Sequence, residues 1–116
     1  MKRDDDYLRE LLFEVESQSS GTLTVVGTMG LSPEKEKLLY HIALLCDAGL
    51  MTQISSANYR MTNQGHDYLA AVRSDTVWNK TKVGAAKVGG MTLKMMMDVA
   101  IAYGKQEVAE KLGINL

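Results

Sequence analysis

The first part of the chain places its apolar residues at helical spacing. One face carries Tyr7, Leu8, Leu11, Leu12 and Val15. Charged residues occupy most of the other positions, so the pattern predicts an amphipathic helix over residues 4–17. The acidic residues from Asp4 to Asp6 favour its start, because negative charge complements the positive end of the helix dipole. Phe13 points away from the apolar face, so we expect a later element or a subunit contact to cover it.

The pattern then becomes strand-like. Residues 17–21 are polar and predict a loop, and residues 22–26, four of which are β-branched, predict a strand. Ser32 before Pro33 is typical of a helix start, and Gly49 suits the left-handed position that ends a helix. Two short strands then follow, at residues 50–55 and 59–61, and Ser55 to Asn58 would join them as a hairpin.

The remaining half of the chain is predicted to be mainly helical. Thr62 or Asn63 caps a helix that breaks or bends around Ser74-Asp75 and resumes at Thr76. Residues 83–90 are small and contain three glycines, which favours a flexible connection. A last helix starts at Thr92, and we expect Gly104 to interrupt it.

A helix, a second helix ending in Gly-Leu, and a hairpin follow the plan of a winged helix-turn-helix. We therefore predict an α+β, mainly helical fold. Residues 1–74 would form the winged-helix domain, and residues 75–116 a C-terminal helical extension packed on it as a single structural unit. Residues 18–31, where the first helix of the helix-turn-helix is expected, are rich in Ser, Gly, Thr and Val, so we expect them to be extended.

Two segments resemble known repressors. Residues 40–50, YHIALLCDAGL, resemble the end of the recognition helix in arsenical-resistance-type and phenolic-acid-type repressors, and residues 60–69, RMTNQGHDYL, resemble the segment after their wing. Residues 1–12, together with YH, AGL, TxxGHDYL and WNKTK, resemble more closely a bacterial and prophage family, the domain of unknown function twenty-five-thirteen. That resemblance implies a winged-helix fold and carries no established activity.

Composition narrows the class of protein. The 116 residues are 46% hydrophobic with a net charge of -1, which is typical of one globular domain. The lone cysteine, Cys46, excludes a disulfide framework and suits a reducing compartment. Apolar stretches fall short of the roughly 18 residues of a membrane span. The N-terminus resembles no secretory signal, so we expect a cytoplasmic protein without membrane contact.

Charge is distributed unevenly along the chain. Residues 1–58 hold five basic and nine acidic residues, a net charge of -4, whereas the remainder has +3, most of it between Arg73 and Lys94. Basic clusters favour phosphate binding. We therefore expect a transcriptional regulator of bacterial or phage origin that binds double-stranded DNA. Its candidate phosphate contacts are Lys35, Lys37, Arg60, Lys80 and Lys82. Trp78, which closely precedes Lys80 and Lys82, either stacks on a base or anchors the C-terminal helices.

A protein-binding module is the alternative. Glu34 and Glu36 would repel phosphates, and Tyr40 and Leu44 share the outward face of the helix over residues 33–48. Such a module would act as a phage-encoded inhibitor of a host defence, in the manner of an anti-CRISPR protein, or of a transcription complex. The last helix is apolar on more than half its circumference, which favours a homodimer through it. The candidate partner-facing residues are Phe13, Tyr40, Leu44, Met95, Val99 and Tyr103.

Catalytic chemistry finds no support in the pattern. Phosphate-binding glycine loops, the Gly-x-Ser-x-Gly elbow and the His-Glu-x-x-His zinc motif are missing from the sequence. His41 and Cys46 are five residues apart, on different faces of a helix, which argues against a metal site. We expect His41 to be a buried or capping residue beside the Gly49 turn and Cys46 a small core residue, with no enzymatic activity, cofactor or metal.

Overall fold

The computed structural model describes residues 1–26 and 30–116 and divides into two compact units. Unit 1 comprises residues 1–66 and unit 2 residues 67–116. Thr28 and Met29, which we expected to lead into the second helix, lie outside the described residues. In the part of the chain that is described, no helix combines the length and apolar character needed to cross a membrane.

Unit 1 begins with α1, which spans Asp5–Ser17 and confirms the first predicted helix. Asp4 is its N-cap, and the carboxylate accepts a hydrogen bond from the Tyr7 backbone N–H at 3.0 Å. The apolar face is buried as expected, at Leu8, Leu11, Leu12 and Val15. Capping and the apolar face therefore specify this helix locally and through packing.

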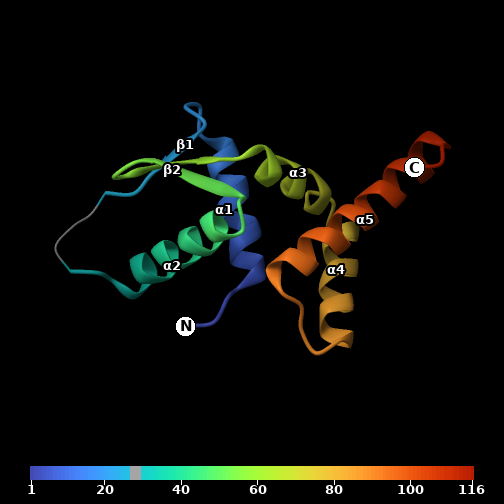
Figure 1. Ribbon diagram of the computed structural model, residues 1–116, viewed down its shortest axis with the longest axis horizontal. Coiled ribbons are helices and arrows are strands. Elements are labelled where there is room, and N and C mark those ends of the chain that lie inside the picture. Colours follow the sequence, from blue (N-terminus) through green and yellow to red (C-terminus); the bar gives the residue numbers. More distant parts are fainter. Residues whose placement is uncertain (27–29) are drawn as a thin grey trace. The chain divides into compact units, whose positions relative to one another are not determined.

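A three-stranded antiparallel sheet follows, in the order β1-β3-β2. Its strands are β1 (Thr22–Thr24), β2 (Met51–Ser55) and β3 (Asn58–Met61). The β2–β3 hairpin is confirmed, with Thr52 opposite Arg60. Leu23 of β1 lies opposite Tyr59, a pairing between distant segments that the local pattern did not predict. α1 contacts both β1 and β3 (Figure 1).

α2 spans Pro33–Asp47 and leads directly into the hairpin. The predicted start is confirmed, since the Ser32 hydroxyl accepts a hydrogen bond from the Lys35 backbone N–H. Gly49 has a φ of 76°, which is the left-handed conformation expected after the helix. Between β1 and α2, the described residues contain no helix, in agreement with the extended chain that we expected there.

α3 (Asn63–Val72) starts in unit 1, and unit 2 continues with α4 (Asp75–Lys87) and α5 (Leu93–Leu112). The predicted starts at Thr62 and Thr92 are confirmed, because each hydroxyl accepts a hydrogen bond from a backbone N–H in the first turn. The predicted break around Ser74 is also confirmed, but α4 begins at Asp75, one residue before the expected Thr76, with the Ser74 hydroxyl as its cap. The described residues thus form five helices and one small sheet, which confirms an α+β, mostly helical fold.

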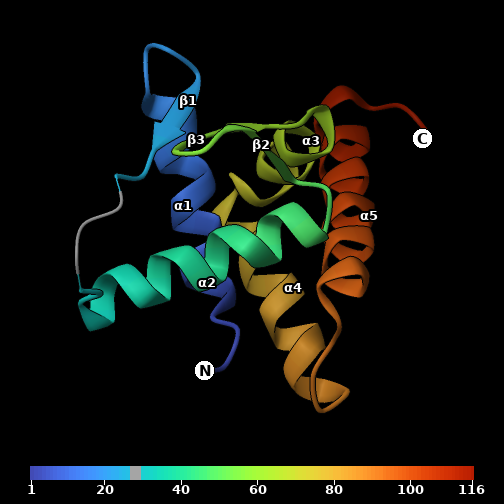
Figure 2. The same cartoon turned by 60° about the vertical axis from the view of Figure 1, so that its left-hand side comes forward.

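Two expectations about unit 2 were wrong. Residues 83–87 are helical rather than a flexible connection, and α5 runs through Gly104 without interruption. A glycine inside a helix costs only about 1 kcal/mol, and the packing of α4 on α5 outweighs that cost (Figure 2). The turn between these helices needs glycine at Gly89 and Gly90, whose φ values are 77° and 118°.

Candidate functional site

A buried histidine joins α2 to the start of α1. His41 is 0% exposed, and its Nε2 accepts a hydrogen bond from the Asp4 backbone N–H at 2.9 Å. Its Nδ1 lies 2.8 Å from the Lys37 carbonyl oxygen and therefore carries the ring proton. The prediction of a buried, capping role is confirmed, but the residue caps the start of α1 and does not lie at the Gly49 turn. Both ring nitrogens are occupied by the chain itself.

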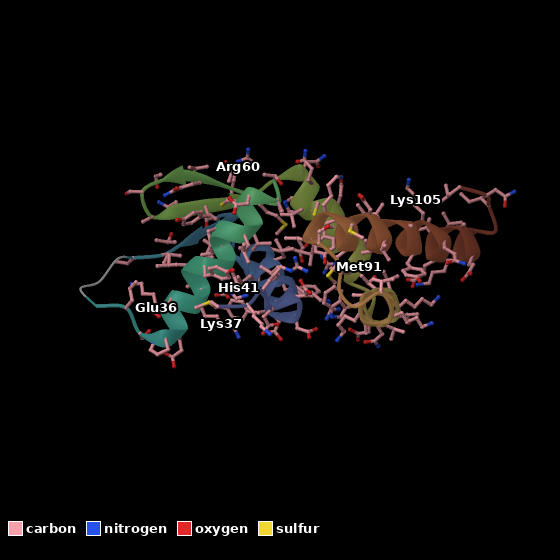
Figure 3. All side chains as sticks on the ribbon, turned by 60° about the horizontal axis from the view of Figure 1, so that its bottom comes forward. Glu36, Lys37, His41, Arg60, Met91 and Lys105 are labelled. Atoms are coloured by element: carbon pink, nitrogen blue, oxygen red, sulfur yellow. The ribbon has the colours of Figure 1, made fainter. Side chains whose placement is uncertain are left out.

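Lys37, a candidate phosphate contact, is directed toward α1. Its Nζ lies 3.3 Å from the Asp4 carboxylate and 4.5 Å from the centre of the Tyr7 ring. The pKa of the Asp4 carboxyl is lowered, first by the Tyr7 backbone N–H and further by Lys37. Figure 3 shows Lys37 and His41 near each other on α2 beside α1. The ammonium group therefore already has a carboxylate partner within unit 1.

The other lysine of α2 also contacts its own chain, because the Lys35 ammonium donates to the Val26 carbonyl oxygen. The outward face of α2 consequently carries mostly acidic and apolar character. We call this surface the α2 face, and it comprises Glu34, Glu36, Tyr40, Leu44 and Asp47. Leu44 is half-buried, the others are exposed, and Tyr40 retains 37% of its accessible surface.

The hairpin provides one exposed cation. Arg60 lies on β3, apart from Glu36 and Lys37 of α2 (Figure 3). Its guanidinium donates to the Met61 carbonyl oxygen at 3.3 Å while the side chain as a whole stays exposed. The turn itself, Ser56-Ala57, carries no charge. Arg60 is thus the cation with which the hairpin presents positive charge to solvent.

The candidate lysines of α4 belong to two faces of that helix. The Lys80 ammonium lies 5.7 Å from the centre of the Tyr103 ring on α5, whereas the Lys82 ammonium lies 5.6 Å from the Trp78 ring. Trp78 is only 2% exposed, so its ring is not available for stacking on a base. The anchoring alternative for Trp78 agrees with this burial.

A cavity of about 550 Å³ lies between α4 and α5 in unit 2. Its polar lining residues are Asn79, Lys80, Lys87, Tyr103 and Gln106, and Val83 and Gly84 complete the lining on α4. Its volume is typical of a small-ligand site. Lys87 and the cavity were missed in the sequence. The signal that would have indicated them is the spacing of seven residues between two lysines, which places both on one helix face.

The apolar candidates differ in exposure. Met95 is 49% exposed on α5, while Val99, Tyr103 and Phe13 are half-buried. The Arg9 guanidinium covers the Phe13 ring at 5.1 Å. Cys46 is half-buried rather than fully in the core, and desolvation followed by the charge of Asp47 raises the pKa of its thiol. The homodimer through α5 stays a prediction.

Comparison with known proteins shows which family the chain belongs to. The model of the family described as "Hypothetical protein (DUF2513)" matches residues 2–92. The chain belongs to the DUF2513 family. A protein of Haemophilus influenzae, named "Uncharacterized protein", is 41% identical over 92 residues, which cover 71% of this chain and 76% of that protein. No solved structure matches the chain.

The part of the chain that matches DUF2513 contains residues 2–66 of unit 1, including the α2 face, and extends through α4. α5 begins at Leu93, just beyond the match. The cavity therefore combines one wall from the DUF2513 segment, on α4, with a second wall from the helix that follows it.

Proposed function

We propose that residues 1–66 form a winged-helix module that binds a protein partner through the α2 face. One observation carries this proposal: both lysines of α2 contact their own chain, and the face left outward bears Glu34, Glu36 and Asp47. A helix that reads bases normally presents cationic or amide side chains to the groove. This helix presents carboxylates, which DNA phosphates repel.

The arrangement of elements supports the winged-helix part of the proposal. α1, β1 and α2 precede the β2–β3 hairpin, and β1 pairs with β3, so the hairpin projects from a sheet that α1 covers. In winged helix-turn-helix proteins, the recognition helix lies before such a hairpin. α2 occupies that position here, which makes its outward face the natural contact surface of the module.

The chemistry of the α2 face defines the partner. Tyr40 offers an aromatic ring of the kind that is enriched among residues contributing most to binding energy. The acidic residues around it favour a surface rich in Lys and Arg, and complementary charge raises the rate of association. Proteins that handle nucleic acids carry such surfaces, so an inhibitor of a host defence or transcription complex fits this chemistry.

Double-stranded DNA is the second candidate partner. The exposed Arg60 on the hairpin favours it, because a wing commonly contacts the DNA backbone beside the recognition helix. Lys80 and Lys82 would add phosphate contacts from α4. Binding of this kind would have little sequence preference and would weaken steeply as salt rises.

The two candidates differ in the residues they require. Glu36→Lys and Tyr40→Ala change the α2 face, and Glu110→Lys is a matched control, since Glu110 is an exposed residue of α5. The tagged chain and each variant would be used to capture partners from a bacterial host lysate. A captured protein would then be purified, and its affinity measured against salt by calorimetry. A random duplex of about 20 base pairs would be titrated in parallel at low salt.

We expect a stoichiometric partner with a basic surface that binds the wild type and Glu110→Lys equally. Glu36→Lys and Tyr40→Ala should each weaken that complex by about tenfold or more, the range for a central interface residue. The proposal is overturned if the α2 variants bind every captured partner as tightly as the wild type. Duplex binding that Arg60→Gln abolishes and Glu36→Lys strengthens would instead establish the second candidate.

A further inference from the structure

The cavity between α4 and α5 combines positive charge with hydrogen-bond donors. Lys80 and Lys87 are two helical turns apart, about 10.5 Å along α4, on the face that lines the cavity. Asn79 and Gln106 bring side-chain amides from the two helices, and Tyr103 contributes a half-buried phenol ring. These groups supply ammonium, amide and hydroxyl donors.

Carboxylates are missing from the lining within the described residues. Glu107 on α5 accepts hydrogen bonds from Ser74 at 3.0 Å and Lys111 at 3.2 Å. Those two contacts are the main reason that the pKa of Glu107 is lowered, and Lys80 contributes less. Lys80 lines the cavity with its ammonium 5.7 Å from the Tyr103 ring, and Lys87 adds a second cation farther along α4.

We infer that this cavity binds a phosphate group. Two ammonium groups along one wall, with the Asn79 amide beside Lys80 and the Tyr103 and Gln106 donors on α5, suit an anion with several acceptor oxygens. The phosphate belongs either to a free nucleotide or to a nucleic-acid backbone, and the chemistry of recognition is shared. The inference concerns unit 2 and does not depend on the protein partner proposed for the α2 face.

Gly84 gives the cavity its room. It lies between Lys80 and Lys87 on the lining face of α4, and a Cβ atom built there would meet the Met91 Cε at 3.5 Å, an ordinary contact. Figure 3 labels Met91 near α4. A larger side chain at position 84 would therefore extend into the cavity without a clash at its base. Gly84→Leu should fill the cavity and also favour the helix.

The test is a titration of the full-length, ¹⁵N-labelled chain followed by nuclear magnetic resonance. The probes are inorganic phosphate, adenosine monophosphate and a random duplex of about 20 base pairs, each at low salt. Chloride at matched ionic strength controls for screening. Lys80→Gln and Lys87→Gln remove the two charges, and Lys105→Gln is the matched control because Lys105 lies on α5 outside this cavity. Gly84→Leu is paired with Ala86→Leu, an exposed position on α4.

We expect saturable shifts with at least one probe, confined to residues 79–87 and 103–106. Each lysine variant should weaken that binding by about fivefold, and Lys105→Gln by much less. Gly84→Leu should abolish it while Ala86→Leu preserves it. Binding of the mononucleotide but not the duplex identifies a free ligand, and the reverse identifies a backbone phosphate. The inference is overturned if no probe gives saturable shifts, or if the Lys80, Lys87 and Lys105 variants bind alike.

Discussion

Lys37 on α2 and Lys87 on α4 occupy helices of similar length, 15 and 13 residues, yet their surroundings differ. The Lys37 ammonium is held by Asp4 and the Tyr7 ring, whereas Lys87 lines an open cavity with a second lysine. A positive residue on a helix thus indicates a phosphate contact only when its own chain leaves the charge available. In unit 1, polar side chains of α2 contact the start of α1, whereas in unit 2 the lysines of α4 line a cavity.

The largest expected effect is a loss of stability in unit 1, where a glycine packs closely against the backbone. A Cβ atom added at Gly65 would collide with the Leu50 carbonyl oxygen and approach the Met61 Cγ to 2.5 Å. Gly65→Ala should therefore lower the free energy of unfolding by about 3 kcal/mol or more, as overpacking against a rigid backbone does. Urea denaturation followed by circular dichroism measures this change.

Glycines of unit 2 provide the contrast. A Cβ atom at Gly104 would approach the Ala71 Cβ at 3.3 Å, and at Gly84 it would make only an ordinary contact. Gly104→Ala should lower the free energy of unfolding by less than Gly65→Ala does. Gly84→Ala should leave it unchanged or raise it, because alanine favours the helix. Equal losses for Gly65→Ala and Gly84→Ala would contradict the packing difference between the units.

The second effect concerns the histidine that joins the helices of unit 1. His41→Phe keeps a ring of similar size but leaves the Asp4 backbone N–H without its acceptor. The free energy of unfolding should fall by about 1–3 kcal/mol, which is the cost of leaving a buried donor without an acceptor. Tyr40→Phe is the control, since that ring is exposed, and it should change stability by less than about 0.5 kcal/mol. Thermal denaturation of the two variants compares them directly.

The smallest effect is a dependence on pH. The folded-state pKa of Asp4 is lowered from 3.8, so its carboxylate stabilises unit 1 above that value and this contribution disappears as pH falls through the folded pKa. Asp4→Asn keeps a capping oxygen but removes the charge. At neutral pH the free energy of unfolding of the wild type should exceed that of Asp4→Asn by less than about 1 kcal/mol, because the side chains of Asp4 and Lys37 are nearly half exposed.

The wild type and Asp4→Asn would be unfolded with urea at several pH values between about pH 7 and pH 3. The difference between their free energies of unfolding should shrink toward zero as Asp4 becomes protonated. Lys37→Gln should remove part of the same difference, since it deletes the partner of the carboxylate. A difference that grows on acidification would show that Asp4 does not stabilise unit 1 through its charge.

Local chemistry made much of this fold predictable from the sequence. The caps at Ser32, Thr62, Ser74 and Thr92 depend on a hydroxyl within three residues of its backbone partner, so composition and position identify them. Gly49, which follows α2, is predictable for a similar local reason, because glycine readily adopts the left-handed conformation that ends a helix. The hairpin also has a local signal, because both strands and their turn are contiguous.

Contacts between distant residues account for what the sequence did not reveal. The pairing of β1 with β3 and the bond between Asp4 and His41 join segments more than 30 residues apart. The glycines of residues 83–90 predict a flexible connection, although packing of α4 against α5 keeps Gly84 helical. The ion pair between Lys37 and Asp4 also joins distant segments, and it leaves α2 with an acidic outward face that favours a basic protein partner over DNA.

The most direct test compares the two lysine pairs in one phosphate-binding experiment. Adenosine monophosphate and duplex DNA would be titrated into Lys35→Gln/Lys37→Gln and Lys80→Gln/Lys87→Gln at low salt, with each double variant first shown to be folded by circular dichroism. We predict that the α2 double variant binds as the wild type does and that the α4 double variant loses saturable binding. Loss of binding in the α2 variant, with full retention in the α4 variant, would contradict this account.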